Sequence, residues 1–75
     1  MADKTLDTKG LNCPFPIMNA GKALSQLPTG ATLEVLATDP GSVPDFQAFC
    51  ESTGNTMVEQ SEAGGVYRFV IQRAA

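Results

Sequence analysis

The sequence predicts an α/β (α+β) protein: a two-layer α/β sandwich in which two helices cover one face of a mixed four-stranded sheet. Segments with the apolar spacing of helices alternate with β-rich segments in the order β-α-β-α-β-β. The first two strands enclose a helix, which indicates a parallel crossover, and a glycine-containing turn between the last two indicates a hairpin. Because 75 residues are too few for two hydrophobic cores, we expect a single domain over residues 1–75.

The first strand is expected at Thr5–Thr8, where polar and apolar residues alternate before Gly10. The next segment carries a cysteine between a glycine and two prolines, in the order Lys9-Gly10-Leu11-Asn12-Cys13-Pro14-Phe15-Pro16-Ile17. Pro14 suits the first position of a helix, because the N–H that proline lacks would have no partner there. Cys13 is therefore expected at the N-terminus of the first helix or next to it.

The first helix is expected to begin at Pro14 and to end before Pro28. Its apolar residues recur at helical spacing, at Ile17, Ala20, Leu24 and Leu27. Gly21 lowers helix stability by about 1 kcal/mol relative to alanine, which favours the interpretation that it permits close packing against the sheet. After a turn at residues 28–30, a β-rich run at residues 32–38 is expected to form the second strand.

The second helix is expected after residues 39–42, an Asp-Pro-Gly-Ser cluster whose Asp and Ser side chains can accept hydrogen bonds from free amides. Its apolar stripe consists of Val43, Phe46, Phe49 or Cys50, and Thr53. Asp45 lies near the helix N-terminus, where negative charge is favourable, and Gly54 follows the last helical residue. Since Cys50 shares the face of Phe46, it is expected to be a buried core residue.

The last two strands are expected at residues 56–60 and 66–72, joined by a loop at residues 61–65 that contains two glycines. Alternation places Tyr67, Phe69 and Ile71 on the buried face of the second of these strands. Val66 and Val70 then fall on the opposite, open face of the sheet. We therefore expect that open face to be partly apolar.

The position of Cys13 predicts a reactive thiol. The free amides at a helix N-terminus carry partial positive charge, which stabilises the thiolate, the nucleophilic form of cysteine. Such cysteines have pKa values of roughly 3.5 to 7.5, against about 8.5 for a free thiol. We therefore expect a lowered pKa for Cys13, with Lys9 and Lys22 as possible additional sources of positive charge.

Composition argues against several other classes of function. The net charge of −3 and only five basic residues argue against direct nucleic-acid binding. The absence of histidine excludes imidazole catalysis within the chain, and without a CxxC pattern we expect no metal and no cofactor. No run of about twenty apolar residues and no secretory leader are found, so we expect a cytoplasmic protein without a membrane interaction. Two cysteines are fewer than disulfide-stapled domains usually carry, so we expect reduced thiols.

Two motifs resemble those of a known family. The pattern Leu6-Asp7-x-x-Gly10-Leu11-x-Cys13-Pro14-x-Pro16 resembles the signature of the TusA-type (SirA-like) sulfur carriers, with their CPxP motif. The pattern Leu33-x-Val35-x-x-Thr38-Asp39-Pro40-Gly41, followed by Asp45 and Phe46, is also similar to that family, and the likeness extends from Leu6 to Arg73. The resemblance implies the same two-layer fold.

The resemblance also implies roles for individual residues. Cys13 matches the cysteine that carries sulfur as a persulfide. The residues that would shape its loop and the environment of its thiolate are Gly10, Asn12, Pro14 and Pro16. Candidate site or partner contacts are Lys9, Phe15, Lys22 and Asp45, of which Asp45 could equally serve as a helix-capping residue. In two places the chain departs from many relatives: Gly21 replaces a basic residue, and Asn55 replaces a histidine.

By this resemblance, the leading hypothesis is a small cytoplasmic sulfur carrier of the sulfurtransferase type that acts only with partner proteins. Cys13 would accept sulfane sulfur from a donor, such as a cysteine desulfurase or a rhodanese-like protein. It would then relay the sulfur to an acceptor protein in tRNA thiolation, cofactor synthesis or sulfur oxidation. A chain without histidine suits such a carrier better than a self-sufficient enzyme, and whether it is an enzyme in its own right stays open.

Two alternatives belong to other classes of function. The chain could be a non-catalytic interaction or regulatory module that docks a protein through the CPxP loop or the open sheet face. It could also be a thiol redox sensor that uses Cys13 and Cys50, which is the weaker alternative because Cys50 is expected in the core.

Overall fold

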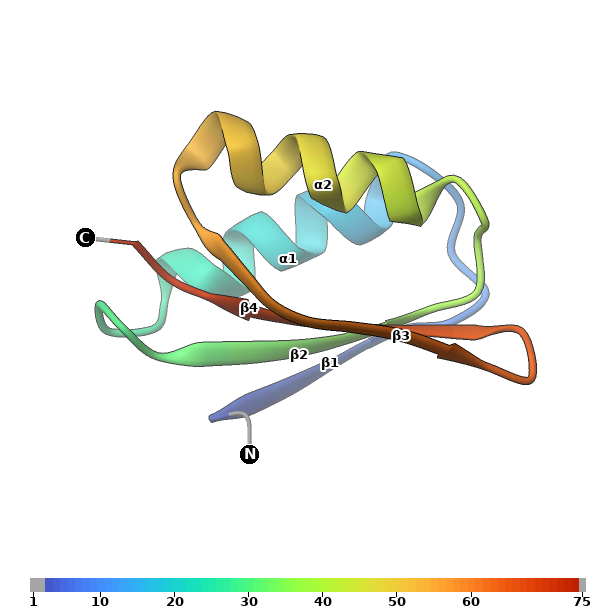
Figure 1. Ribbon diagram of the computed structural model, residues 1–75, viewed down its shortest axis with the longest axis horizontal. Coiled ribbons are helices and arrows are strands. Elements are labelled where there is room, and N and C mark those ends of the chain that lie inside the picture. Colours follow the sequence, from blue (N-terminus) through green and yellow to red (C-terminus); the bar gives the residue numbers. More distant parts are fainter. Residues whose placement is uncertain (1–2, 75) are drawn as a thin grey trace.

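The computed structural model describes residues 3–74, which form two helices packed on one face of a four-stranded sheet (Figure 1). The elements follow one another as β1 (Lys4–Thr8), α1 (Phe15–Ser25), β2 (Thr32–Ala37), α2 (Ser42–Thr53), β3 (Thr56–Ala63) and β4 (Val66–Gln72). The strands lie in the order β1-β2-β4-β3, with β1 parallel to β2 and the other pairs antiparallel. The predicted mixed sheet and two-layer architecture are therefore confirmed.

The boundaries of β1 and β2 differ by one residue from those expected, and those of α1 and β3 differ in ways that matter more for the site and the sheet. Helix α1 begins at Phe15, so that Pro14 precedes it and Pro16 lies in its first turn. It ends at Ser25 rather than just before Pro28. Strand β3 continues to Ala63, and the turn of the hairpin is only Gly64–Gly65, both with positive φ (58° and 83°). The polar residues at the end of β3 are exposed and carry no apolar alternation, which is why the sequence pattern did not extend the strand this far.

The hydrophobic core lies between the helices and the sheet. Phe46 of α2 stacks on Phe69 of β4 with ring centroids 4.7 Å apart, and its edge meets the Phe49 ring at 6.2 Å. Both Phe46 and Phe69 are completely buried. Cys50 belongs to the same cluster and is 7% exposed, which confirms its expected place in the core.

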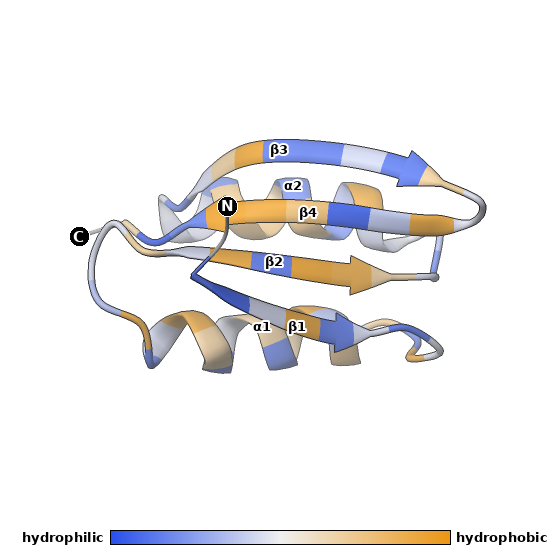
Figure 2. Ribbon diagram, turned by 90° about the horizontal axis from the view of Figure 1, so that it is seen from below, coloured by the Kyte–Doolittle hydropathy of each residue, from blue (hydrophilic) through white to orange (hydrophobic). Residues whose placement is uncertain are grey.

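The open face of the sheet carries charged side chains, and Figure 2, which views this side, shows hydrophilic segments among hydrophobic ones along the strands. Arg68 forms ion pairs with Glu34 on β2 and with Glu59 on β3. Hydrogen bonding to Arg68, and then to Thr5, lowers the pKa of Glu34. Val70 stands opposite Glu34 and Glu59 in the sheet and is only 4% exposed, so the prediction of an exposed valine there is wrong.

Gly21 faces α2 and not the sheet, contrary to expectation. The nearest atoms to a side chain at this position would be those of the Phe49 ring on α2, at 3.6 Å. This is an ordinary van der Waals distance, so Gly21 lies at the contact between the two helices without being required for it. Neither helix within residues 3–74 has the length and hydrophobicity needed to cross a membrane.

Candidate functional site

The thiol lies where two loops meet at one end of the sheet. Because β1 and β2 are parallel neighbours, their carboxyl ends lie at the same edge, and the loops that follow them, residues 9–14 and 38–41, run side by side (Figure 1). The Gly10 amide donates to Thr38 Oγ1 at 2.9 Å, and the Cys13 amide donates to Asp39 Oδ2 at 3.0 Å. These two hydrogen bonds fix the thiol loop against the start of α2.

The backbone of the thiol loop follows from its sequence. Gly10 has φ +83°, a conformation that favours glycine, and the following Leu11 amide donates to the Thr8 carbonyl at 3.1 Å. The Asn12 carbonyl accepts a hydrogen bond from the Phe15 amide at 2.9 Å. The Cys13–Pro14 peptide bond is cis. Gly10 thus provides the positive φ of this loop, and the carbonyl of Asn12 accepts one of its backbone hydrogen bonds.

Asp39 is a residue of this site that the sequence interpretation missed. One carboxylate oxygen accepts from the Cys13 amide, and the other accepts from the Gly41 amide at 3.1 Å. The carbonyl of Asp39 accepts from both the amide (2.9 Å) and the hydroxyl (2.6 Å) of Ser42, so Ser42 donates here, whereas its side chain was expected to accept. Asp39 accepts from free amides as expected, but Gly41 is the N-cap of α2 and no side chain caps the helix. The aspartate also binds the thiol loop across a separation of 26 residues.

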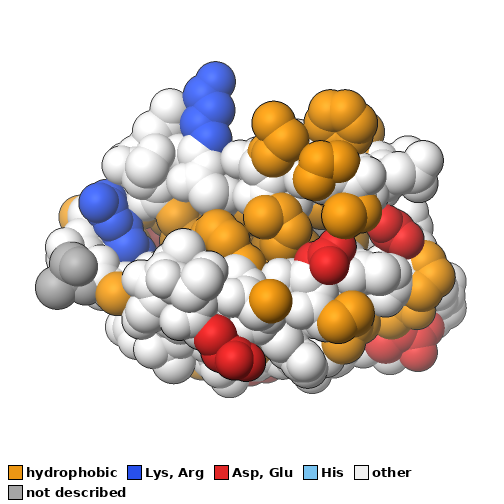
Figure 3. Space-filling model, turned by 90° about the horizontal axis from the view of Figure 1, so that it is seen from above, with side chains coloured by type: hydrophobic (Ala, Val, Ile, Leu, Met, Phe, Trp, Pro, Cys, Tyr) orange, Lys and Arg blue, Asp and Glu red, His pale blue; other side chains and the backbone are white. Residues whose placement is uncertain are grey.

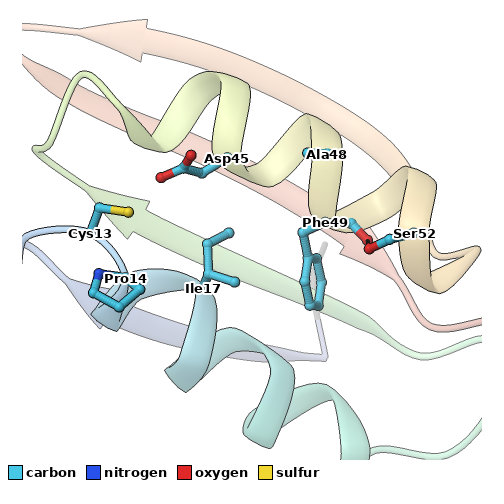
Figure 4. A pocket seen from close by; sticks show the side chains of 7 residues that line it. All are labelled: Cys13, Pro14, Ile17, Asp45, Ala48, Phe49 and Ser52. Atoms are coloured by element: carbon cyan, nitrogen blue, oxygen red, sulfur yellow. Dashed lines mark hydrogen bonds between the residues drawn. The ribbon is translucent and has the colours of Figure 1, made fainter.

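An open pocket of about 400 Å³ lies beside the thiol, between α1 and α2 (Figure 4). Cys13 and Asp45 point toward each other from opposite sides of this pocket, and Ile17 and Phe49 provide apolar side chains along it. The complete lining consists of Cys13, Pro14, Ile17, Asp45, Ala48, Phe49 and Ser52. Of the candidate contacts taken from the sequence, Asp45 is the one that shares this pocket with Cys13.

The charge environment of Cys13 is the reverse of the one expected. Hydrogen bonding to Asp45 raises the pKa of the exposed Cys13 thiol, as do slight desolvation and the negative charges of Asp45 and Asp39. The expectation of a lowered pKa is therefore wrong.

The start of α1 has few free N–H groups whose positive charge could offset the negative charges of Asp45 and Asp39. Pro14 and Pro16 have no N–H, and the amides of Phe15 and Met18 donate to the carbonyls of Asn12 and Pro14. The Cys13 amide is itself bound to Asp39. Few free amides remain beside the thiol, so the helix N-terminus does not supply the positive potential that the sequence argument assumed.

The two lysines expected to assist the thiol do not supply that charge either. The Lys9 ammonium pairs with Asp7 at 3.9 Å. Lys22 lies in the last turn of α1, about 10 Å along the helix axis from Phe15 at its first residue. The charged side chains that act on the thiol are thus Asp45 and Asp39, both acidic.

Apolar side chains are exposed around the thiol loop. Phe15 is 54% exposed, Met18 58% and Leu11 37%, and all three lie in the loop or in the first turn of α1. Figure 3 shows hydrophobic side chains gathered over the helical face, with acidic groups beside them and the basic groups of this face set apart toward one end. Phe15, a candidate partner contact, belongs to this apolar surface.

The second cysteine has a different environment. Cys50 is free and buried, and burial raises the pKa of its thiol, whereas Cys13 is free and exposed. Within residues 3–74, no three Cys, Asp or Glu side chains come together in the way that a metal site requires.

Comparisons with known proteins identify the family. The family model for the sulfurtransferase TusA matches residues 4–73. The chain is 50% identical over 72 residues to the sulfur carrier protein TusA of Allochromatium vinosum, covering 96% of this chain and 95% of the relative. It is 41% identical over 73 residues to the sulfur carrier protein TusA of Pseudomonas entomophila, covering 97% and 91% of the two chains.

A solved structure agrees with this assignment. The crystal structure of a SirA-like protein from Desulfitobacterium hafniense superposes with a TM-score of 0.84 at 30% sequence identity, covering 96% of this chain and 99% of the other. The sequence match extends over almost the whole described chain, and the fold agrees with it. The chain therefore belongs to the TusA family.

Proposed function

We propose that this chain is a sulfur carrier in which residues 1–75 act as one domain and Cys13 bears the transferred sulfur. The proposal rests on the family, whose members from A. vinosum and P. entomophila are named sulfur carrier proteins. The single structural observation that supports it most is that Cys13 is exposed beside an open pocket while Cys50 is buried in the core. A carrier needs one accessible thiol, and Cys13 meets that requirement.

The proposed reaction is a transfer of sulfane sulfur in two steps. In the first step, the Cys13 thiolate attacks the terminal sulfur of a donor protein's persulfide. A new S–S bond forms on Cys13, the donor's S–S bond breaks, and the donor cysteine leaves as a thiolate that takes up the proton lost by Cys13. In the second step an acceptor nucleophile removes the terminal sulfur and Cys13 leaves as a thiolate. No external oxidant or reductant is consumed in the first step.

The surroundings of Cys13 suit contact with proteins. Both steps bring a second active site to the thiol, and the exposed side chains of Leu11, Phe15 and Met18 offer apolar area for such contacts. The donor would be a cysteine desulfurase or a rhodanese-like protein, and the acceptor would belong to tRNA thiolation, cofactor synthesis or sulfur oxidation. We place this exchange in the cytoplasm, where thiols are kept reduced.

The test is persulfide loading followed by intact-mass measurement. A cysteine desulfurase supplied with cysteine should add the mass of one sulfur atom to the wild type. Cys13→Ser should remain unloaded, because it lacks the nucleophile. Cys50→Ala is the matched control, because it removes the other thiol and should still be loaded. An unloaded wild type, or equal loading of Cys13→Ser, would contradict the proposal.

A further inference from the structure

Asp45 faces Cys13 across the pocket, so its carboxylate can influence the protonation of the thiol. The side chain comes from the first turn of α2, whereas Cys13 precedes α1, so the two groups meet only through the packing of the two helices. Because the carboxylate faces the sulfur, its negative charge and acceptor oxygens favour the protonated thiol over the thiolate. Asp45 is therefore placed to retain the proton on Cys13.

The other described groups near Cys13 do not oppose this effect. Asp39 adds a second negative charge from the β2–α2 loop. On the thiol's own loop, Lys9 pairs with Asp7, and on α1 the basic residue Lys22 lies in the last turn. Two prolines and occupied amides leave the start of α1 with little capacity to stabilise an anion. Among residues 3–74, the charged side chains that shift the pKa of Cys13 are both acidic, so a partner is the expected source of positive charge for its thiolate.

We propose that Asp45 is a positioning residue that holds Cys13 as a thiol in the free carrier, and that a sulfur donor activates Cys13 by placing a Lys or Arg side chain against Asp45. This inference rests on the proposed sulfur-carrier function and specifies how its partner is recognised. The donor's cation pairs with the carboxylate and neutralises the charge that disfavours a thiolate on Cys13. As the sulfur attacks the donor's persulfide, its proton passes to the donor cysteine that leaves as the S–S bond breaks. Activation is thereby confined to the complex.

This arrangement has a chemical advantage for a carrier with an exposed thiol. A cysteine that stays protonated while free reacts slowly with oxidants and stray electrophiles, because the thiolate is the reactive form. The acidic pocket thus keeps Cys13 unreactive in the free carrier and allows it to react in the complex with the donor.

The first test measures the pH dependence of Cys13 alkylation by iodoacetamide, from about pH 6 to about pH 10, a range that brackets the ordinary thiol pKa. Asp45→Asn should alkylate several-fold faster than the wild type at neutral pH, with the midpoint of its profile moved to lower pH. Asp45→Glu, which keeps the carboxylate, should restore much of the wild-type profile. Glu51→Gln removes the same charge from an exposed position on α2 and is the matched control, so its profile should match the wild type.

The second test measures charge selectivity with two small disulfides, cationic cystamine and neutral hydroxyethyl disulfide. At low salt the wild type should react faster with cystamine, because its ammonium group can approach Asp45, and added salt should reduce this preference. Asp45→Asn should lose most of the preference, while Glu51→Gln should keep it.

Unchanged alkylation profiles or unchanged cystamine preference in a folded Asp45→Asn variant would overturn the inference. If that variant does not fold, Asp45→Ser provides a second neutral substitution with the same expected results. Neither test uses a persulfide. A wild type that fails to accept sulfur from any donor would therefore refute the proposed function, whereas a wild type that is loaded while Asp45→Asn keeps the wild-type profile would refute only this inference.

Discussion

At the scale of single residues, Asp39 connects the parts of the site. Its carboxylate accepts hydrogen bonds from the backbone of both loops, at Cys13 and at Gly41. An acceptor that satisfies two backbone amides at once resembles a helix cap in its energetic role, but here it also joins segments far apart in sequence. Together with the hydrogen bond from Gly10 to Thr38, this side chain helps to set the position of the thiol relative to α2, and hence to Asp45.

Replacing Asp39 should loosen that connection. We expect Asp39→Ala to lower the free energy of unfolding by about 1–2 kcal/mol, because both amides lose their acceptor. Urea denaturation followed by far-UV circular dichroism measures the change. Glu51→Ala is the control, since it removes an exposed carboxylate from α2 and should change stability by less than about 0.5 kcal/mol. Equal effects of the two substitutions would show that the Asp39 hydrogen bonds contribute nothing.

At the scale of elements, two glycines can be distinguished by their backbone. Gly21 is inside α1, and a methyl group there would meet the Phe49 ring at 3.6 Å, an ordinary van der Waals distance. Gly54 ends α2 with φ +78°, where an L side chain is strained. We expect Gly21→Ala to raise the free energy of unfolding by about 0.5–1 kcal/mol through helix propensity, and Gly54→Ala to lower it by about 1 kcal/mol.

Thermal and urea unfolding of the two variants test this pair directly. Each serves as the control for the other, because the chemical change is the same and only the backbone conformation differs. A destabilised Gly21→Ala would mean that the helices cannot accept a methyl group between α1 and Phe49. That result would give Gly21 a packing role stronger than the one its contact distance indicates.

The elements could be predicted from sequence because their signals are local. The helical spacing of Ala20 and Leu24 and the alternation of Phe69 and Ile71 correctly identify which faces are buried. The end of β3 could not be predicted, since its last residues are exposed and pair with β4 only through backbone hydrogen bonds. Val70 lies opposite Glu34 and Glu59 in the sheet, and alternation alone could not predict that its exposure is only 4%.

The site was predictable only in part, because tertiary packing and not local sequence determines which charged side chains lie near Cys13. Cys13 stands out by its position between Gly10 and the prolines, but its electrostatics depend on Asp39 and Asp45, which tertiary packing brings to it. The parallel pairing of β1 and β2 could have indicated that residues 38–41 lie beside the thiol loop. The two prolines, visible in the sequence, could also have warned that the first turn has few N–H groups to offer.

At the scale of the whole molecule, a small core supports the pocket. Phe46 is completely buried, stacks on Phe69 and contacts Phe49, whose ring lines the pocket. A domain of this length has a total stability on the order of 4–11 kcal/mol. One aromatic residue in such a core therefore accounts for a large share of what keeps the chain folded and the pocket in shape.

We therefore expect Phe46→Ala to lower the free energy of unfolding by about 3–5 kcal/mol, through lost burial and the cavity left behind. Phe46→Leu, which keeps much of the apolar volume, should cost only about 1–2 kcal/mol and remain folded. Urea unfolding measures both, and iodoacetamide alkylation of Cys13 in the folded Phe46→Leu variant should keep a pH profile near that of the wild type, because Asp45 is unchanged. If Phe46→Leu instead alkylated like Asp45→Asn, the relation between Cys13 and Asp45 would depend on core packing rather than on the carboxylate itself.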